Sequence, residues 1–344
     1  MSNSQHPTTN NQYQHKPKKF HVKQNKGIAR TANKEKPGLL FEQELLNACP
    51  LCGSEGERKI VLSAQDYLVS EEVFHVEQCP SCDLQYTNPR PKPLKIRDYY
   101  LSEAYISHAG EARSPLEWAY QLVRRLMIQK KIRLLRRYIK PGGEVMDIGC
   151  GTGAFLEVLQ SKGYKVRGYE PQESARKIAQ NKNLNVSGKD DNLEGLPDQC
   201  LDGITLWHVL EHIHELGSNL ELYRRLLVPG GFLIIAVPVH SAFDAGFYGE
   251  GWAAYDLPRH LYHFNRKTLQ NALGTHGFRL LSRKGLPFDS LYVSLLSEKQ
   301  MGKLPVGLRQ ARALTIGMIS NLYAMSRQKP WSSEMFVFQK GKLA

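Results

Sequence analysis

The sequence contains no long hydrophobic run. None of its 344 residues lies in a stretch of the roughly 18 apolar residues that a membrane-spanning helix needs, and the segment beginning Met1-Ser-Asn-Ser contains no apolar stretch typical of a signal peptide. We therefore expect a cytoplasmic protein without a membrane span. Aromatic residues make up only 9% of the chain, but hydrophobic residues reach 41% and charged residues 23%, which allows a large core and excludes a fibrous or wholly disordered protein.

Acidic residues are nearly absent from the first 38 positions. Eight lysines and arginines there stand against Glu35 alone, so this segment supplies +7 of the net charge of +13. Large apolar residues are scarce as well, and the segment cannot bury enough surface to offset the entropy of ordering. We predict a disordered basic tail over residues 1–46, either a solubilising arm or a tether to nucleic acid or another anionic surface. No aromatic platform for bases is interleaved with the lysines, which favours the solubilising arm.

Cysteine is also sparse, but four of the six cysteines form two C-x-x-C pairs. These are Cys49 with Cys52 and Cys79 with Cys82. Four thiolates complete a tetrahedral zinc shell, and a closed shell leaves no position for a reactive water. We therefore expect a structural Zn²⁺ in a zinc ribbon over residues 47–92. A redox dithiol or an iron centre are the alternatives.

A change of pattern follows the cysteine pairs. We assign residues 93–142 to a linker and an amphipathic helix from about Leu116 to Ile139, where apolar residues recur with helical spacing. From Gly143 onward, short apolar runs alternate with helical patterns, which is typical of parallel strands joined by crossover helices. Strands are expected at residues 145–148, 165–169, 201–206, 232–237, 278–282 and 335–338, with a helix at about residues 308–325. The prediction for residues 143–344 is an α/β domain.

The strongest local signal is a glycine-rich turn after the first of these strands. The stretch V-M-D-I-G-C-G-T-G at residues 145–153 places Asp147 before glycines that let a ligand approach the backbone. The spacing also satisfies the dinucleotide fingerprint, but Asp147 would repel a pyrophosphate. The same carboxylate would attract the ammonium group of S-adenosylmethionine, which carries no phosphate. A second acid, Glu170, ends the next strand, where a carboxylate can accept hydrogen bonds from both ribose hydroxyls.

These motifs resemble those of class I S-adenosylmethionine-dependent methyltransferases. The resemblance rests on residues 147–153, on Glu170, on LDGITLWHVLEH at residues 201–212 and on LVPGG at residues 227–231. It implies a doubly wound, seven-stranded and mostly parallel sheet whose last strand is antiparallel. It also implies the residues that hold the cofactor: Asp147, Gly149, Gly151 and Gly153 for the methionine part, Glu170 for the ribose, Asp190 or Asp191 for the adenine, and Trp207 and His208 beside the pocket.

The cysteine pairs and DLPRHLYHF at residues 256–264 narrow the resemblance to bacterial zinc-ribbon-bearing methyltransferases similar to the deoxysugar C-methyltransferases. In that group the matching stretch ends in Asp-Glu-His, whose histidine is proposed as the base. The match falls on His260, with Arg259 in place of the glutamate, and an arginine there would lower the histidine pKa or bind an anionic substrate group. We predict His260 as general base and His212 as an assisting residue. Substrate contacts are expected from Tyr248, Trp252, Asp256 and Arg259.

The predicted function is methyl transfer from S-adenosylmethionine to a small-molecule acceptor, either a nucleotide-linked sugar or a related anionic metabolite. An RNA or protein methyltransferase that binds its partner through the basic tail and the ribbon is one alternative, and a non-catalytic binding protein that keeps the fold is another. The sequence HVLEH at residues 208–212 also spells a zinc-peptidase motif, but it directly follows a strand, which disfavours that class.

Overall fold

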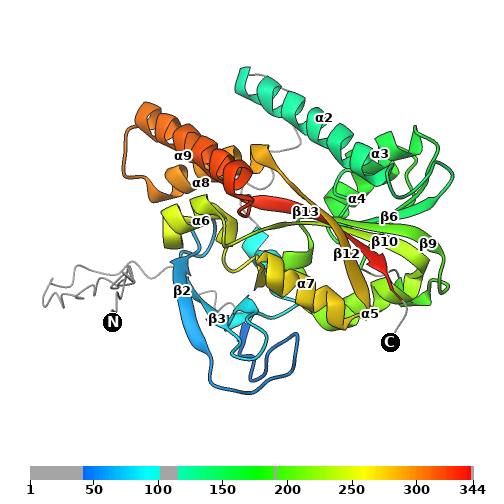
Figure 1. Ribbon diagram of the computed structural model, residues 1–344, viewed down its shortest axis with the longest axis horizontal. Coiled ribbons are helices and arrows are strands. Elements are labelled where there is room, and N and C mark those ends of the chain that lie inside the picture. Colours follow the sequence, from blue (N-terminus) through cyan, green and yellow to red (C-terminus); the bar gives the residue numbers. More distant parts are fainter. Residues whose placement is uncertain (1–41, 101–114, 190, 192, 342–344) are drawn as a thin grey trace, which may run out of the picture. The chain divides into compact units, whose positions relative to one another are not determined.

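The computed structural model describes residues 42–100, 115–189, 191 and 193–341 (Figure 1). Residues 1–41 of the predicted basic tail and Asp190 lie outside the described residues. Near the predicted end of that tail, Gln43–Glu44 form strand β1, which pairs with β5 (Arg90–Pro91). No helix in the described part of the chain is long and apolar enough to cross a bilayer.

The segment with the four cysteines forms a small antiparallel sheet. Its own strands are β2 (Lys59–Gln65), β3 (Val73–Gln78) and β4 (Gln85–Thr87), and the 3₁₀ helix η1 (Ile96–Tyr100) follows them. A fourth strand, β11 (Tyr262–His263), comes from the distant C-terminal half and pairs with β4. The cysteine module is thereby joined to the rest of the protein by backbone hydrogen bonds.

A seven-stranded sheet forms the centre of the larger domain. Its order is β12 (Phe278–Gly285), β13 (Ser333–Lys340), β10 (Leu227–Pro238), β9 (Leu201–Trp207), β6 (Glu144–Ile148), β7 (Lys165–Tyr169) and β8 (Val186–Ser187). The strands from β10 to β8 are parallel, whereas β13 is antiparallel to both β10 and β12. The predicted doubly wound, mostly parallel sheet with an antiparallel last strand is confirmed.

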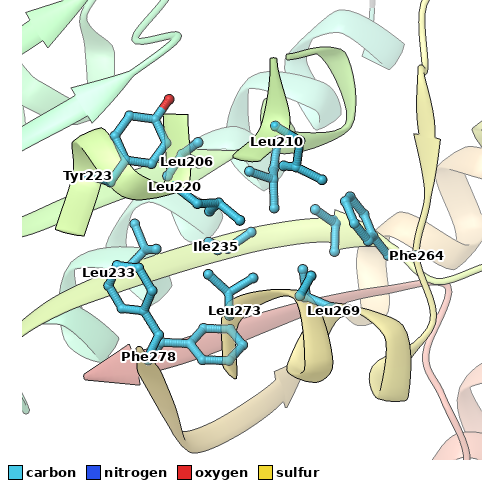
Figure 2. Close-up of a cluster of buried hydrophobic side chains, with 14 of the residues drawn as sticks. Leu206, Leu210, Leu220, Tyr223, Leu233, Ile235, Phe264, Leu269, Leu273 and Phe278 are labelled. Atoms are coloured by element: carbon cyan, nitrogen blue, oxygen red, sulfur yellow. The ribbon is translucent and has the colours of Figure 1, made fainter. Parts of the chain in front are cut away.

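Buried side chains pack on both faces of this sheet. On one face they come from β9, β10, α5 (Leu216–Leu226) and α7 (Arg266–Thr275), as Figure 2 shows. The same cluster includes Cys49 and Cys79, so the cysteine module shares the core of the larger domain. On the other face lie side chains of α2 (Pro115–Leu135) and α3 (Ala154–Gln160). Helix α2 ends four residues before its predicted end at Ile139.

The remaining helices lie in the connections between strands. They are α4 (Glu173–Gln180), η3 (Leu193–Gly195), η4 (Leu210–His212), α6 (Phe243–Tyr248), η5 (Gly249–Gly251), η6 (Ala253–Tyr255), α8 (Pro287–Met301) and α9 (Val306–Arg327). Helix α9 contains the predicted helix at residues 308–325, whereas α8 was not predicted. Because β6, β7 and β9 are parallel neighbours, their carboxyl ends meet at one edge of the sheet.

Candidate functional site

The glycine-rich turn leaves one position open to a ligand. Gly149, Gly151 and Gly153 all have positive φ angles, of 69°, 55° and 77°. A Cβ atom at Gly149 would lie 2.5 Å from Val209 Cγ2, and one at Gly153 would lie 2.4 Å from Leu184 Cδ1, so these two glycines are needed for packing. At Gly151 a Cβ atom would meet no atom within 4 Å among the described residues. The turn therefore has an open cradle at Gly151, which fits a cofactor lying against the backbone.

Glu170 links this turn to the end of β7. Its Oε2 accepts a hydrogen bond from Gly151 N at 2.8 Å, and its Oε1 accepts one from Gln172 N at 2.8 Å. Burial raises the pKa of this carboxyl group, and the two backbone donors act in the opposite direction. Each oxygen still has a second lone pair, so Glu170 is placed where two ribose hydroxyls can donate to it. Of the two residues predicted for the adenine, Asp191 accepts a hydrogen bond from Gly188 N at 2.5 Å.

Asp147 lies at the buried end of β6, with a side chain only 2% exposed. Thr205 Oγ1 donates to its Oδ1 at 2.5 Å. Burial raises the pKa of Asp147 to about 7, although the Thr205 hydrogen bond and the charge of Lys131 favour the carboxylate. At neutral pH this group is therefore close to its titration midpoint.

We expect the affinity for S-adenosylmethionine to rise about tenfold between pH 6 and pH 8, because only the carboxylate form of Asp147 pairs with an ammonium group. The stability of the unliganded protein should change in the opposite direction. Between the unfolded pKa near 4 and the folded pKa near 7, the folded state holds a proton that the unfolded state releases, so the free energy of unfolding falls as pH rises. Calorimetric titrations with S-adenosylmethionine at pH 6, 7 and 8 test the expected rise in affinity. The affinity of Asp147→Asn should not change with pH. A wild-type affinity that is the same at pH 6 and pH 8 would contradict the expectation.

Trp207 ends β9 and presents an aromatic face to a cation. The ammonium of Lys131 lies 4.6 Å from the centre of its ring, and Phe155 packs edge-on at 5.4 Å. A ring that already attracts an ammonium group is suited to a sulfonium as well. His208 follows with a φ of 58°, and its Nε2 lies 3.2 Å from Asp289 Oδ2. Burial favours the neutral imidazole, but the carboxylates of Asp289 and Glu211 raise the pKa of His208 to about 9.

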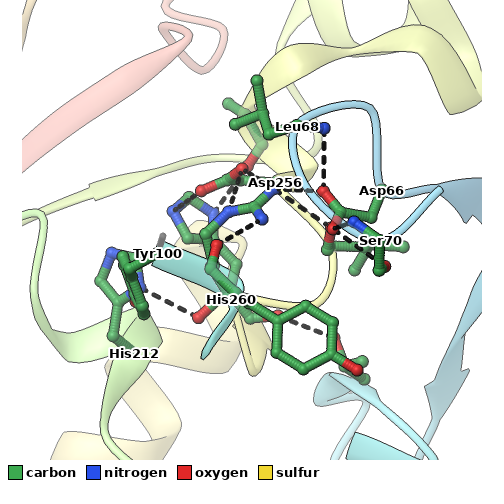
Figure 3. Close-up of polar contacts among 12 residues, drawn as sticks. Asp66, Leu68, Ser70, Tyr100, His212, Asp256 and His260 are labelled. Atoms are coloured by element: carbon green, nitrogen blue, oxygen red, sulfur yellow. Dashed lines mark hydrogen bonds and ion pairs between the residues drawn. The ribbon is translucent and has the colours of Figure 1, made fainter. Parts of the chain in front are cut away.

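His212 and His260, predicted to act on the acceptor, lie together (Figure 3). Their ring centres are 4.6 Å apart, although His212 ends η4 and His260 lies in the distant segment before β11. The Nδ1 atom of His260 faces the carbonyl oxygen of Ala254 at 2.9 Å, and that of His212 faces the carbonyl oxygen of Arg259 at 2.9 Å. Burial, together with the neighbouring His212, lowers the pKa of His260 to about 4. His260 is therefore a neutral imidazole at pH 7.

Sequence reasoning missed Glu211, which lies between these histidines and His208. Its side chain is 1% exposed, and neither carboxylate oxygen has a hydrogen-bond partner among the described residues. One ligand atom each from Glu211, His212 and His260 lie within 4.8 Å of one another. The HVLEH stretch is no zinc-peptidase helix, because only its last three residues are helical, in the 3₁₀ helix η4, and His208 lies against Asp289.

Of the four residues predicted to bind substrate, Tyr248, Trp252 and Arg259 are buried and Asp256 is partly buried, and all but Tyr248 line one pocket. Arg259 is 1% exposed and donates to Asp66 Oδ1 at 2.9 Å and to Asp256 Oδ1 at 2.7 Å. Trp252 is also 1% exposed and donates from Nε1 to Asp244 Oδ2 at 2.9 Å. Tyr248 is 5% exposed. The polar groups of Arg259, Asp256 and Trp252 bond to other parts of the chain, and we assign them to the support of the loop that carries His260.

The four predicted metal ligands form a compact cluster. The sulfur atoms of Cys49 and Cys82 are 3.6 Å apart, as are those of Cys52 and Cys79, and all four lie within 4.8 Å of one another. A tetrahedral zinc ion with Zn–S bonds of about 2.3 Å places its sulfurs about 3.8 Å apart. The cysteine cluster therefore fits a tetrahedral metal ion.

The known proteins to which this chain is similar include several methyltransferases. A family model described as a methyltransferase domain matches residues 119–283. A ubiquinone biosynthesis O-methyltransferase from Paracidovorax citrulli is 25% identical over 164 residues, which cover 44% of this chain and 69% of that relative. A ubiquinone/menaquinone biosynthesis C-methyltransferase from Campylobacter jejuni is 27% identical over 112 residues, or 30% of this chain and 48% of that relative.

Among solved structures, the phosphoethanolamine N-methyltransferase 2 of Haemonchus contortus in complex with S-adenosyl-L-methionine superimposes with a TM-score of 0.47. It is 17% identical, and the match covers 75% of this chain and 63% of that chain. A methyltransferase from Thermotoga maritima superimposes with a TM-score of 0.43 at 19% identity, over 64% of this chain and 93% of that chain.

Proposed function

We propose that this chain, which carries a class I S-adenosylmethionine-dependent methyltransferase domain, transfers the methyl group of S-adenosylmethionine to a small-molecule acceptor. The observation that carries this proposal is the open cradle at Gly151, held by Glu170 and flanked by the buried carboxyl group of Asp147. A dinucleotide would bring its pyrophosphate next to Asp147, whereas S-adenosylmethionine brings an ammonium and a sulfonium group.

In this proposal each chain residue has a defined part. Asp147 and the glycines hold the methionine part of the cofactor, Glu170 the ribose, Asp190 or Asp191 the adenine, and Trp207 and His208 line the pocket. When bound, S-adenosylmethionine supplies an electrophilic methyl group on its sulfonium. The protein must hold the acceptor atom about 3 Å from that methyl and in line with the sulfur.

His260 is the residue we propose to activate the acceptor, with His212 beside it. The carbonyl oxygen of Ala254 can only accept a hydrogen bond, so it fixes the proton of His260 on Nδ1 and leaves the lone pair on Nε2. Because the pKa of His260 is lowered to about 4, this lone pair alone is a weak base for a hydroxyl group.

The acceptor class is the finer part of the proposal. The resemblance to deoxysugar C-methyltransferases favours a nucleotide-linked sugar or a related anionic metabolite, and the O-methyltransferase relatives favour transfer to oxygen. Arg259 is occupied by Asp66 and Asp256 and adds no support for an anionic acceptor. The four-cysteine cluster is proposed to hold a structural zinc ion. No described residue supports the alternative of an RNA acceptor.

A calorimetric titration with a pair of glycine variants tests the cofactor assignment. Gly151→Ala should abolish binding of S-adenosylmethionine and S-adenosylhomocysteine, because its Cβ atom would occupy the cradle. Gly142→Ala is the matched control, since Gly142 also has a positive φ, of 94°, and a Cβ atom there would likewise meet no described atom within 4 Å. Both substitutions strain the backbone by about 1–2 kcal/mol, but only the first should change binding. NAD should bind to neither.

The same protein preparation tests the role of His260. Methyl transfer to sugar nucleotides and to other hydroxylated metabolites is measured for the wild type, His260→Ala and His260→Gln, with cofactor affinity measured in parallel. Both variants should lose turnover by about 100-fold or more while keeping cofactor affinity. Near-normal turnover in both would remove His260 from the mechanism, and a wild type that binds neither sulfur compound would overturn the proposed function.

A further inference from the structure

Glu211 is a buried carboxylate whose oxygens make no hydrogen bond within the described chain. Its side chain is 1% exposed, and it forms an ion pair with His208, whose Nδ1 lies 3.6 Å from Glu211 Oε1. An ionised carboxylate in such a position costs several kcal/mol unless hydrogen bonds or a cation compensate for the lost water. His208 is also 3.2 Å from Asp289, so its charge is shared between two carboxylates. His208 therefore balances the negative charge of Glu211 only in part. A further cation beside Glu211 would offset the cost of burying this charge.

The two neighbouring imidazoles are oriented as metal ligands are. The Nδ1 atoms of His212 and His260 each lie 2.9 Å from a backbone carbonyl oxygen, which can only accept a hydrogen bond. Both protons are therefore on Nδ1, and the hydroxyl of Tyr100, 2.9 Å from Nδ1 of His212, accepts from the same N–H. The Nε2 atoms carry the lone pairs. A ligating histidine in proteins nearly always donates its other ring N–H to a carbonyl or carboxylate in this manner.

We propose that Glu211, His212 and His260 bind a divalent first-row transition-metal ion, through the Glu211 carboxylate and the ring nitrogens of the two histidines that do not face a carbonyl oxygen. One possible ligand atom from each of the three residues already lies within 4.8 Å of the other two. Two imidazoles and one carboxylate suit Fe²⁺, Co²⁺ or Zn²⁺, and three protein ligands leave positions open for other groups. Asp256, whose Oδ2 is 4.0 Å from Nε2 of His260, adds negative charge beside the site.

The role of this ion rests on the proposed function. An acceptor hydroxyl bound at an open position is acidified by the metal charge and loses its proton to water. Its oxygen then forms a bond to the methyl carbon of S-adenosylmethionine, while the carbon–sulfur bond breaks and leaves its electron pair on the sulfur. This arrangement activates a hydroxyl group without requiring a histidine to act as its base. The ion binds to the acceptor side of the pocket and is distinct from the metal of the four cysteines.

Cobalt titration tests the site directly in protein that carries one zinc ion per chain, held by the four cysteines. Co²⁺ bound by nitrogen and oxygen ligands gives visible d–d bands, whereas Co²⁺ bound by thiolates adds a strong charge-transfer band in the near ultraviolet. We expect d–d bands without the thiolate band in the wild type. Glu211→Gln should weaken Co²⁺ binding more than about 100-fold, since loss of a ligand exceeds the loss of a supporting residue. Glu215→Gln is the matched control, because Glu215 lies on the same segment with a side chain 69% exposed, and it should bind Co²⁺ as the wild type does.

The outcomes separate this inference from the proposed function. A thiolate band alone, no cobalt bands, or equal binding by Glu211→Gln and the wild type would overturn the metal site, while tight binding of S-adenosylmethionine in the same samples would uphold the methyltransferase. Cobalt bands that depend on Glu211 in a protein that fails to bind S-adenosylmethionine would uphold the site and overturn the function. Where Glu211→Gln fails to fold, as judged by circular dichroism, His212→Gln replaces it, because His212 is only half-buried and its replacement removes a ligand with less disturbance.

Discussion

Cys79→Ser is expected to remove the metal of the cysteine module and to abolish methyl transfer. Cys79 is fully buried and belongs to the same hydrophobic cluster as Leu206 and Ile235 of the central sheet. Structural zinc contributes about 10–16 kcal/mol of apparent binding energy in small zinc-bound domains, and the proposed zinc ion would stabilise the sheet in which β4 pairs with β11. The residues of β11 directly follow His260 and Leu261. Loss of the metal should therefore disorder the loop that carries His260.

The measurements are zinc content, thermal unfolding and turnover. Cys200→Ser is the control, since Cys200 is a half-buried free thiol that is not part of the four-cysteine cluster, and it should retain metal, stability and activity. Full turnover by a Cys79→Ser protein that holds no zinc would contradict the link between the cysteine module and the methyl-transfer site.

Features set by short sequence spacing could be predicted from the sequence. The glycine turn at residues 149–153, Glu170 at the end of the next strand and the two cysteine pairs each depend on neighbours in the chain and on the rules of parallel sheets. The alternation of strands and helices likewise predicted the sheet, because β-strands that are buried on both faces stand out as apolar runs.

Features that depend on distant partners could not be predicted. Arg259, which stands where the resembled group has a glutamate, was predicted either to lower the pKa of His260 or to bind an anionic substrate group, and its guanidinium pairs with Asp66, 193 residues away. The pKa of His260 is indeed lowered, but the causes are burial and His212. Glu211 was cited only as part of the HVLEH motif, and what marks it in the structure is the absence of hydrogen-bond partners among the described residues.

The ion pair between Asp66 and Arg259 is expected to stabilise the protein and to position His260. Asp66→Asn is expected to destabilise the protein by about 3–5 kcal/mol, because it removes the charge that pairs with a buried guanidinium. Asp66 Oδ1 accepts from Leu68 N and from Arg259, and Oδ2 accepts from Ser70 N. An asparagine keeps only one of these oxygens, so its NH₂ group would face a hydrogen-bond donor at the other position. Arg259 then keeps the carboxylate of Asp256 and the carbonyl oxygens of Tyr99 and Leu257.

Asp83→Asn supplies the matched comparison for this variant. Asp83 also joins the cysteine module to the larger domain, through Lys267 at 3.1 Å, but both side chains are exposed and the pair should contribute at most about 1 kcal/mol. Denaturant unfolding measures the stability difference, and steady-state kinetics measure its effect on the site. Since Arg259 directly precedes His260, Asp66→Asn should lower kcat while the affinity for S-adenosylmethionine stays unchanged. Equal stability and kcat in the two variants would show that the buried ion pair neither stabilises the junction nor positions the histidine.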